Sequence, residues 1–300
     1  MALDVGMPVI IGQDGTELAY RVVQDDGHES TRAAAEPLVC IPGGPMRASA
    51  YLGDLGGLSG RRPLVMLDLR GTGGSGRPAD PGTYRCDRQV GDVEALREHL
   101  GLERLDLLAH SAGGDLAILY AVAHPERVRT LTLVTGRGRA LGFDFTVEHR
   151  REALELRKGE PWFEAGRKAF EAVWAGTASE ADWGAVMPFF YGRWDAAVRA
   201  HAAREVEETN EEAAKSYAAP GAFDPEAARD VAARLEARVL VLAGELDGGP
   251  LPRVAAEIAG LFRDATVLVQ PGAGHFPWLD DPGWFAGAVA GFLEAGEAGN

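Results

Sequence analysis

The sequence predicts an α/β fold in which a mostly parallel sheet is flanked by helices and a helical lid is inserted between two strands. Two observations lead to this prediction. Short apolar runs, each followed by a loop, alternate with helix-like segments, as in sheets whose strands are buried on both faces. Between about Leu141 and Asp230 the strand-like runs stop and helical patterns replace them.

The strands can be read in order along the chain. Pro8 to Ile11 and Glu17 to Val23 are expected to form a hairpin around the turn Gln13-Asp14-Gly15, and the polar stretch from Gln24 to Glu36 is expected to be a loop. The later apolar runs are Leu38 to Ile41, Leu64 to Leu69, Leu105 to Ala109, Leu131 to Val134, Val239 to Ala243 and Thr266 to Val269. We therefore expect residues 1–140 and 231–300 to form one domain and residues 141–230 to form the lid.

The lid is rich in aromatic side chains. Eleven aromatic residues lie between Phe143 and Trp194. They could form the core of the insert or face a site beneath it, and we expect both in part. Among them, Trp174 and Tyr191 are candidates for contact with a substrate.

Composition narrows the classes of function. The chain has 300 residues, 46% hydrophobic and 25% charged, which is typical of a globular protein with a sizeable core. Its formal net charge of -15 disfavours nucleic acid and anionic membrane surfaces as partners and suits a small neutral or cationic ligand. No window is long and apolar enough to span a membrane, and we expect a cytoplasmic protein.

The two cysteines, Cys40 and Cys86, exclude a disulfide framework. Cys40 ends an apolar run, so a buried free thiol is expected. The sequence contains no paired-cysteine or His-Glu-x-x-His spacing, so no metal is expected. Gly71 to Gly76 matches G-x-G-x-x-G, but Arg77-Pro78-Ala79-Asp80-Pro81 follows, where a dinucleotide-binding loop needs a helix. We therefore expect no cofactor.

Ser111 is the predicted nucleophile. It lies in Ala109-His110-Ser111-Ala112-Gly113, between the strand ending at Ala109 and a helix predicted from Asp115 to His124. A serine on such a turn projects its hydroxyl clear of the sheet, beside the free N–H groups of the helix. The pattern differs from G-x-S-x-G because Ala109 replaces the first glycine. The alternative is a serine that caps the helix.

A serine nucleophile needs a base, and the base needs an acid that orients it. In α/β-hydrolases these follow in the order serine, acid, histidine. Asp247 lies in the loop after Val239 to Ala243, and His275 lies in the loop after Thr266 to Val269. Glu245 is the alternative for the orienting acid, but it lies only two residues beyond its strand and is expected to point elsewhere.

An acyl transfer also needs donors for the oxyanion. The backbone N–H of Ala112, directly after the nucleophile, is one candidate. The other is Gly44, in the loop Pro42-Gly43-Gly44-Pro45 after an early strand. The alternative for that loop is a plain Gly-Pro turn.

Five glutamates crowd one helical stretch of the lid: Glu205, Glu207, Glu208, Glu211 and Glu212. One interpretation is a solvated face, supported by Glu211 and Lys215 at i,i+4. The other is that Glu205, Glu208 or Glu212 points into the site and holds a substrate ammonium group. Asp115 is expected to be structural.

Together, these segments resemble the proline iminopeptidase group of α/β-hydrolases. The resemblance rests on Gly43-Gly44-Pro45, Leu67-Asp68-Leu69-Arg70-Gly71-Thr72-Gly73-Gly74-Ser75, the turn at Ser111, and Gly274-His275-Phe276-Pro277-Trp278. It implies the roles above for Ser111, Asp247, His275, Gly44 and Ala112, with lid glutamates that hold a free amino group. Pro42 and Met46 replace the histidine and last glycine of the group's H-G-G-P-G loop.

The resulting expectation is a serine hydrolase that releases an N-terminal amino acid from a short peptide or an aminoacylated small molecule. One alternative is a carboxylesterase or lactonase that acts on small esters. An alternative from another class is a non-catalytic protein of the same fold that binds a small molecule. The oligomeric state and the identity of the substrate are not predicted by the sequence.

Overall fold

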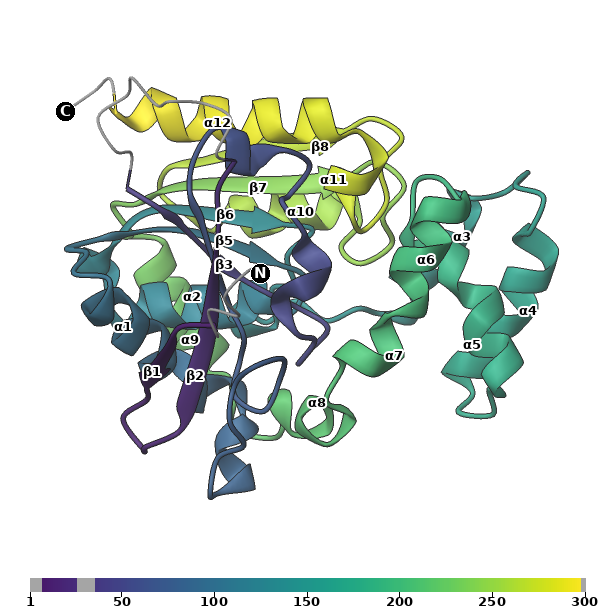
Figure 1. The fold of residues 1–300 in the computed structure, drawn as a ribbon. Coiled ribbons are helices and arrows are strands. Elements are labelled where there is room, and N and C mark those ends of the chain that lie inside the picture. Colours follow the sequence, from purple (N-terminus) through teal and green to yellow (C-terminus); the bar gives the residue numbers. More distant parts are fainter. Residues whose placement is uncertain (1–6, 26–35, 298–300) are drawn as a thin grey trace.

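The computed structural model describes residues 7–25 and 36–297 (Figure 1). Most of the loop expected from Gln24 to Glu36 lies outside the described residues. The hairpin expected at the N-terminus is present, because Val9–Ile11 pairs antiparallel with Glu17–Val23.

The α/β prediction is confirmed by one eight-stranded sheet of order β1-β2-β4-β3-β5-β6-β7-β8. Strands β3 to β8 run parallel, and β2 joins β4 antiparallel. The strands are β1 (Val9–Ile11), β2 (Glu17–Val23), β3 (Leu38–Ile41), β4 (Leu64–Leu67), β5 (Leu105–His110), β6 (Val128–Val134), β7 (Arg238–Gly244) and β8 (Ala265–Gln270).

Two strands differ from their apolar runs by two or more residues at one end, and polar side chains account for both differences. β6 begins at Val128, three residues before the run that predicts it. Its polar residues Arg129 and Thr130 both bond the buried Asp106 carboxylate on β5, at 2.7 Å. β4 ends at Leu67, because the next residue, Asp68, turns its carboxylate to the backbone N–H of Ser49 at 2.7 Å.

Helices cover both faces of the sheet, and alternate residues of each strand face alternate layers. On one face, Val39 and Ile41 of β3 share a core with the helices α1, α2, α9 and α10. On the other, Leu38 and Cys40 share a core with α12. These helices are α1 (Val90–His99), α2 (Gly113–Ala123), α9 (Pro225–Ala232), α10 (Pro252–Ala259) and α12 (Pro282–Glu297), which the short α11 (Pro277–Asp280) precedes.

Between β6 and β7 the described chain is helical. Besides α9, which packs on the sheet, the α-helices there are α3 (Val147–Glu155), α4 (Phe163–Trp174), α5 (Glu180–Val186), α6 (Ala196–Ala203), α7 (Glu205–Glu208) and α8 (Glu211–Tyr217). Helices α3 to α6 stand beyond the carboxyl ends of the parallel strands, and α7 and α8 lead back beneath the sheet (Figure 1). Phe163, Phe170 and Phe189 pack into a separate small core there. None of the described helices is long and apolar enough to cross a membrane.

Candidate active site

Ser111 lies on the sharp turn between β5 and α2. Its φ of 51° falls in the left-handed region, which non-glycine residues rarely adopt. Hydrogen bonds hold the turn in this conformation: the Ser111 N–H donates to the Val134 carbonyl at 3.1 Å, and the Ser111 carbonyl accepts from Gly114 at 2.9 Å. The strand–serine–helix arrangement expected of a nucleophile turn is therefore present.

Small residues around this turn allow three backbone segments to meet. A Cβ on Gly43 would lie 2.5 Å from the His110 carbonyl oxygen and 2.9 Å from the Ser111 Cβ. A Cβ on Gly113 would lie 2.4 Å from the Pro42 carbonyl oxygen. The methyl group of Ala109, which replaces the first glycine of the common pattern, is fully buried in the core. The loop after β3 thus lies directly against the nucleophile turn.

Ser111, His275 and Asp247 are joined by two hydrogen bonds at the carboxyl ends of β5, β8 and β7. His275 Nε2 lies 2.8 Å from Ser111 Oγ, and its Nδ1 lies 2.9 Å from Asp247 Oδ2. The other oxygen of Asp247 accepts the Gly249 N–H at 2.9 Å. All three side chains are buried. In this arrangement Nδ1 donates to Asp247, which leaves Nε2 free to accept the serine proton.

Glu245, the rival for the acid, points elsewhere. It is exposed, and its carboxylate accepts the Gly272 N–H at 2.7 Å. It therefore braces the loop that carries His275 without bonding the imidazole, while Asp247 does bond it.

Two backbone donors lie beside the serine. In the described part of the chain, the N–H groups of Gly44 and Ala112 have no hydrogen-bond acceptor. The backbone after this donor is held as well, because the buried Tyr217 hydroxyl donates to the Ala112 carbonyl at 2.9 Å. Gly44 has a φ of +116°, which favours glycine. Free donors next to a nucleophile are what an oxyanion hole requires.

The lid glutamates are not equivalent. Glu208 is paired with the buried Arg47, whose Nε and Nη2 each lie 2.8 Å from its carboxylate. Arg47 Nη1 lies 3.9 Å from Glu205. Glu212 lies on α8 with an exposed side chain. Arg47 belongs to the loop that carries Gly44, so this ion pair fastens the lid to that loop.

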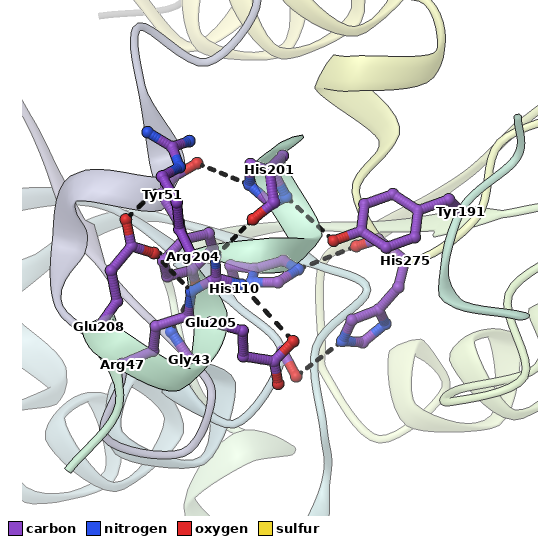
Figure 2. A network of polar contacts seen from close by, with 11 residues as sticks. Gly43, Arg47, Tyr51, His110, Tyr191, His201, Arg204, Glu205, Glu208 and His275 are labelled. Carbon is purple, nitrogen blue, oxygen red and sulfur yellow. Dashed lines mark hydrogen bonds and ion pairs between the residues drawn. The ribbon is translucent and has the colours of Figure 1, made fainter. Parts of the chain in front are cut away.

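Of these glutamates, Glu205 faces the triad. Its carboxylate points toward the His275 imidazole (Figure 2). The side chain is 42% exposed. Burial among protein atoms nevertheless raises the pKa of Glu205, while the charges of Arg47 and His275 oppose that rise. A carboxylate in this position can accept hydrogen bonds from a cationic group bound above Ser111.

An apolar cavity borders His275. Its volume is about 150 Å³, which is enough for one aromatic ring. His275 and Asp247 lie at one end, and Trp174 of the lid lines it. The other aromatic lining residues are Phe143, Phe145, Phe170, Phe189 and Phe190. Tyr191 is placed differently: it is buried and its hydroxyl bonds His201 Nδ1 at 3.0 Å.

Three buried polar residues beneath the site were not predicted from the sequence: Tyr51, His110 and His201. Each is bonded to the others or to a catalytic loop (Figure 2). His110 stands inside the nucleophile motif, and a polar residue at the end of a buried strand is a signal that it has a partner. Tyr51 and His201 carry no such local signal.

Comparisons with known proteins agree with this fold. A family model described as alpha/beta hydrolase fold matches residues 36–282. A proline iminopeptidase of Lactobacillus helveticus is 40% identical over 124 residues, and a human (lyso)-N-acylphosphatidylethanolamine lipase is 39% identical over 100 residues. The matched segments cover 40% of this chain and 40% of the first relative, and 33% and 29% for the second. The matches thus span less than half the length of these relatives.

Solved structures share the whole fold. The proline iminopeptidase of Mycobacterium smegmatis superposes with a TM-score of 0.75 at 24% identity, covering 98% of this chain and 99% of the other. An esterase of Thermogutta terrifontis superposes with a TM-score of 0.67 at 20% identity, covering 97% and 99%. At these identities the likeness concerns the fold alone.

Proposed function

Because this chain belongs to the alpha/beta hydrolase fold family, we propose that it is a serine hydrolase in which Ser111, His275 and Asp247 perform a two-step acyl transfer. The observation that carries the proposal is the pair of hydrogen bonds, 2.8 Å and 2.9 Å, that links the three side chains. A nucleophile, a base and an orienting acid in this order are the parts that acyl transfer requires.

In the first step, His275 Nε2 takes the proton of Ser111 Oγ as the oxygen attacks a carbonyl carbon. The negative charge that develops on the carbonyl oxygen is stabilised by the N–H groups of Gly44 and Ala112. His275 then returns the proton to the leaving amine or alcohol, and an acyl-enzyme remains. Water, deprotonated by His275, attacks this ester, and His275 returns the proton to Ser111 Oγ as the acid leaves. Asp247 stabilises the imidazolium in both steps.

Gly44→Ala is expected to lower the hydrolysis rate by about 100- to 1,000-fold, because the loop must shift and carry the residue 44 N–H away from the oxyanion, which has the usual effect of losing one oxyanion donor. The added Cβ would meet Arg47 N at 2.7 Å and Arg47 Cβ at 2.9 Å, and a φ of +116° disfavours any side chain. Steady-state hydrolysis of p-nitrophenyl acetate measures the effect. The matched control is Gly15→Ala, which also has a positive φ but meets nothing within 4 Å. Equal losses of rate in the two variants would rule out the role of Gly44.

We further propose that the substrate is a short peptide or aminoacylated small molecule with a free N-terminal amino group. Glu205 supports this, since its carboxylate lies where a substrate ammonium group could bind it. The cavity supports it as well, because its volume suits one ring or a branched side chain. The curated relatives that match part of this chain include proline iminopeptidases.

The amine requirement is tested with Glu205→Gln. We expect kcat/KM for aminoacyl p-nitroanilides, prolyl included, to fall about 10- to 100-fold because a charge-assisted contact is lost. Hydrolysis of p-nitrophenyl acetate should change less than about twofold. The pKa of Glu205 is raised, so in the wild type KM for amine substrates should increase as the pH falls through that pKa.

Glu212→Gln is the matched control, because Glu212 is an exposed glutamate of the same segment. An equal effect of the two substitutions, or no effect of Glu205→Gln on the anilides, would contradict the assignment of Glu205.

The second candidate is a carboxylesterase or lactonase. It is favoured by Arg47, whose guanidinium is bonded to Glu208 and lies 3.9 Å from Glu205, so the glutamates already face one cation. Turnover of esters without turnover of any aminoacyl amide would decide for this candidate. A protein that neither hydrolyses these compounds nor reacts with a fluorophosphonate would instead be a small-molecule-binding member of the fold.

A further inference from the structure

We propose that Tyr51 is a positioning residue of the acyl transfer, because its hydroxyl ties the oxyanion loop to the loop of the catalytic histidine through His110. The inference rests on the proposed function, since it assigns a task within that reaction. Tyr51 lies seven residues beyond Gly44, on the 3-10 helix Ser49–Leu52, and is 2% exposed. Figure 2 shows its neighbours.

Three hydrogen bonds form one continuous network that connects the oxyanion loop, the nucleophile turn and the loop of His275. The Gly43 N–H donates to the Tyr51 hydroxyl oxygen at 2.7 Å. The Tyr51 hydroxyl lies 2.7 Å from His110 Nδ1. His110 Nε2 lies 2.9 Å from the carbonyl oxygen of His275. Gly43 precedes the oxyanion donor Gly44, and His110 precedes the nucleophile. This hydrogen-bond network therefore joins the oxyanion donor, the nucleophile and the catalytic histidine.

The donor and the acceptor of each hydrogen bond in this network follow from the groups involved. The His275 carbonyl can only accept, so His110 Nε2 carries the proton. A neutral imidazole then has an acceptor at Nδ1, so Tyr51 donates its hydroxyl proton to it. Burial lowers the pKa of His110 well below its usual value, and the charges of the nearby His275, Arg47 and His201 also oppose its protonation. His110 therefore stays neutral, and each hydrogen bond of the network keeps the same donor and acceptor.

A second pair of bonds extends this arrangement to the lid. His201 of α6 lies with Nε2 3.1 Å from the Tyr51 carbonyl oxygen and with Nδ1 3.0 Å from the Tyr191 hydroxyl. The same argument places the His201 proton on Nε2 and makes Tyr191 the donor. Burial lowers the pKa of His201 to about 4, so this imidazole is also neutral near pH 7. Tyr51 is thus held from both sides.

These hydrogen bonds fix the position of the Gly44 N–H relative to Ser111. A donor acts on an oxyanion only if it is held at the position where the negative charge develops. Without the Tyr51 hydroxyl, the buried Gly43 N–H and His110 Nδ1 lose their partner, and the loop can shift to recover one. A displacement on the order of 1 Å is enough to cost about 100-fold in rate. We therefore expect an effect on the transition state more than on substrate binding.

The test is Tyr51→Phe, which removes one oxygen atom and leaves the ring in place beneath the Arg47 guanidinium, 4.5 Å from its centroid. The matched control is Tyr20→Phe. Tyr20 is also buried, and its hydroxyl lies 3.1 Å from His99 Nε2, outside the site. Each variant loses one hydroxyl that bonds a histidine. The Tm should fall by about 2 to 4 °C in Tyr20→Phe and somewhat further in Tyr51→Phe, which also leaves the Gly43 N–H without its partner.

The readout is kcat and KM for p-nitrophenyl acetate, divided by the concentration of active sites titrated with a fluorophosphonate. We expect Tyr51→Phe to lower kcat on the order of 10- to 100-fold with KM within about twofold, and Tyr20→Phe to leave kcat unchanged. Affinity for phenyl trifluoromethyl ketone, whose adduct with Ser111 carries an oxyanion, should weaken by the same factor as kcat/KM.

Wild-type kcat in Tyr51→Phe would overturn the inference while leaving the serine hydrolase standing. A loss of kcat without weaker binding of the ketone would also overturn it, because oxyanion stabilisation would then be unaffected. An equal loss in Tyr20→Phe would overturn it as well, because the effect would not be specific to the site. A wild-type protein that neither reacts with the fluorophosphonate nor cleaves the ester would refute the proposed function, and the role of Tyr51 with it.

Discussion

Ser111→Ala is expected to lower kcat for ester and amide hydrolysis by about 10⁴- to 10⁶-fold, the largest effect of any single substitution in this protein. In the proposed mechanism Ser111 Oγ forms the acyl-enzyme, and alanine offers no nucleophile in its place. The residual rate would come from the Gly44 and Ala112 N–H groups and from substrate binding. Steady-state turnover of p-nitrophenyl acetate measures the loss.

Folding must be shown to survive this substitution. Ser111 is held in the left-handed region by hydrogen bonds of its backbone, which alanine retains. We therefore expect the Tm of the variant to stay near that of the wild type. Ser59→Ala replaces another buried serine, outside the triad, and should retain full activity. Activity of Ser111→Ala within tenfold of the wild type would refute its role as nucleophile.

Asp247→Asn is expected to lower kcat by about 10⁴-fold with little change in structure. Asp247 accepts the Nδ1 proton of His275 at 2.9 Å. Asparagine can turn an N–H toward that nitrogen, which favours the tautomer with its proton on Nε2. In that tautomer the imidazole cannot accept the Ser111 proton, so the first step lacks its base.

The neighbouring carboxylate supplies the control. Glu245→Gln alters a residue two positions earlier, whose carboxylate bonds the Gly272 N–H and not the imidazole. Its expected effect on kcat is less than about threefold. If Glu245→Gln were the more damaging of the two substitutions, the acid would have to be reassigned.

The sheet could be predicted because buried strands leave local signals, and the same kind of signal led to the proposed triad. Buried parallel strands read as continuous apolar runs, and the loops that follow them carry Ser111, Asp247 and His275. Strand ends were less predictable. β6 extends through Arg129 and Thr130, whose polarity hides a strand, because Asp106 on the neighbouring strand satisfies both.

The choice among the lid glutamates could not be predicted, because it depends on contacts between distant segments. Glu205, Glu208 and Glu212 lie close in sequence and look alike. In space, Arg47 binds Glu208 across 161 positions of sequence, Glu205 faces His275, and Glu212 faces solvent. Nothing near Arg47 in the sequence indicates such a partner.

The same limit applies to the aromatic residues of the lid. Trp174 and Tyr191 were both candidates for contact with substrate. Trp174 lines the cavity beside His275, whereas Tyr191 is buried with its hydroxyl on His201. The hydroxyl of a buried tyrosine needs a partner, but the sequence does not say on which side that partner lies.

The most direct test of the account is to trap the acyl transfer on its nucleophile. The wild-type protein is incubated with a fluorophosphonate, its intact mass is measured, and its peptides are mapped. If Ser111 is the nucleophile, the wild-type protein carries one adduct per chain, located on Ser111, and Ser111→Ala carries none. An unmodified wild-type protein, or an adduct on another residue, would contradict the claim that Ser111, His275 and Asp247 form the catalytic centre.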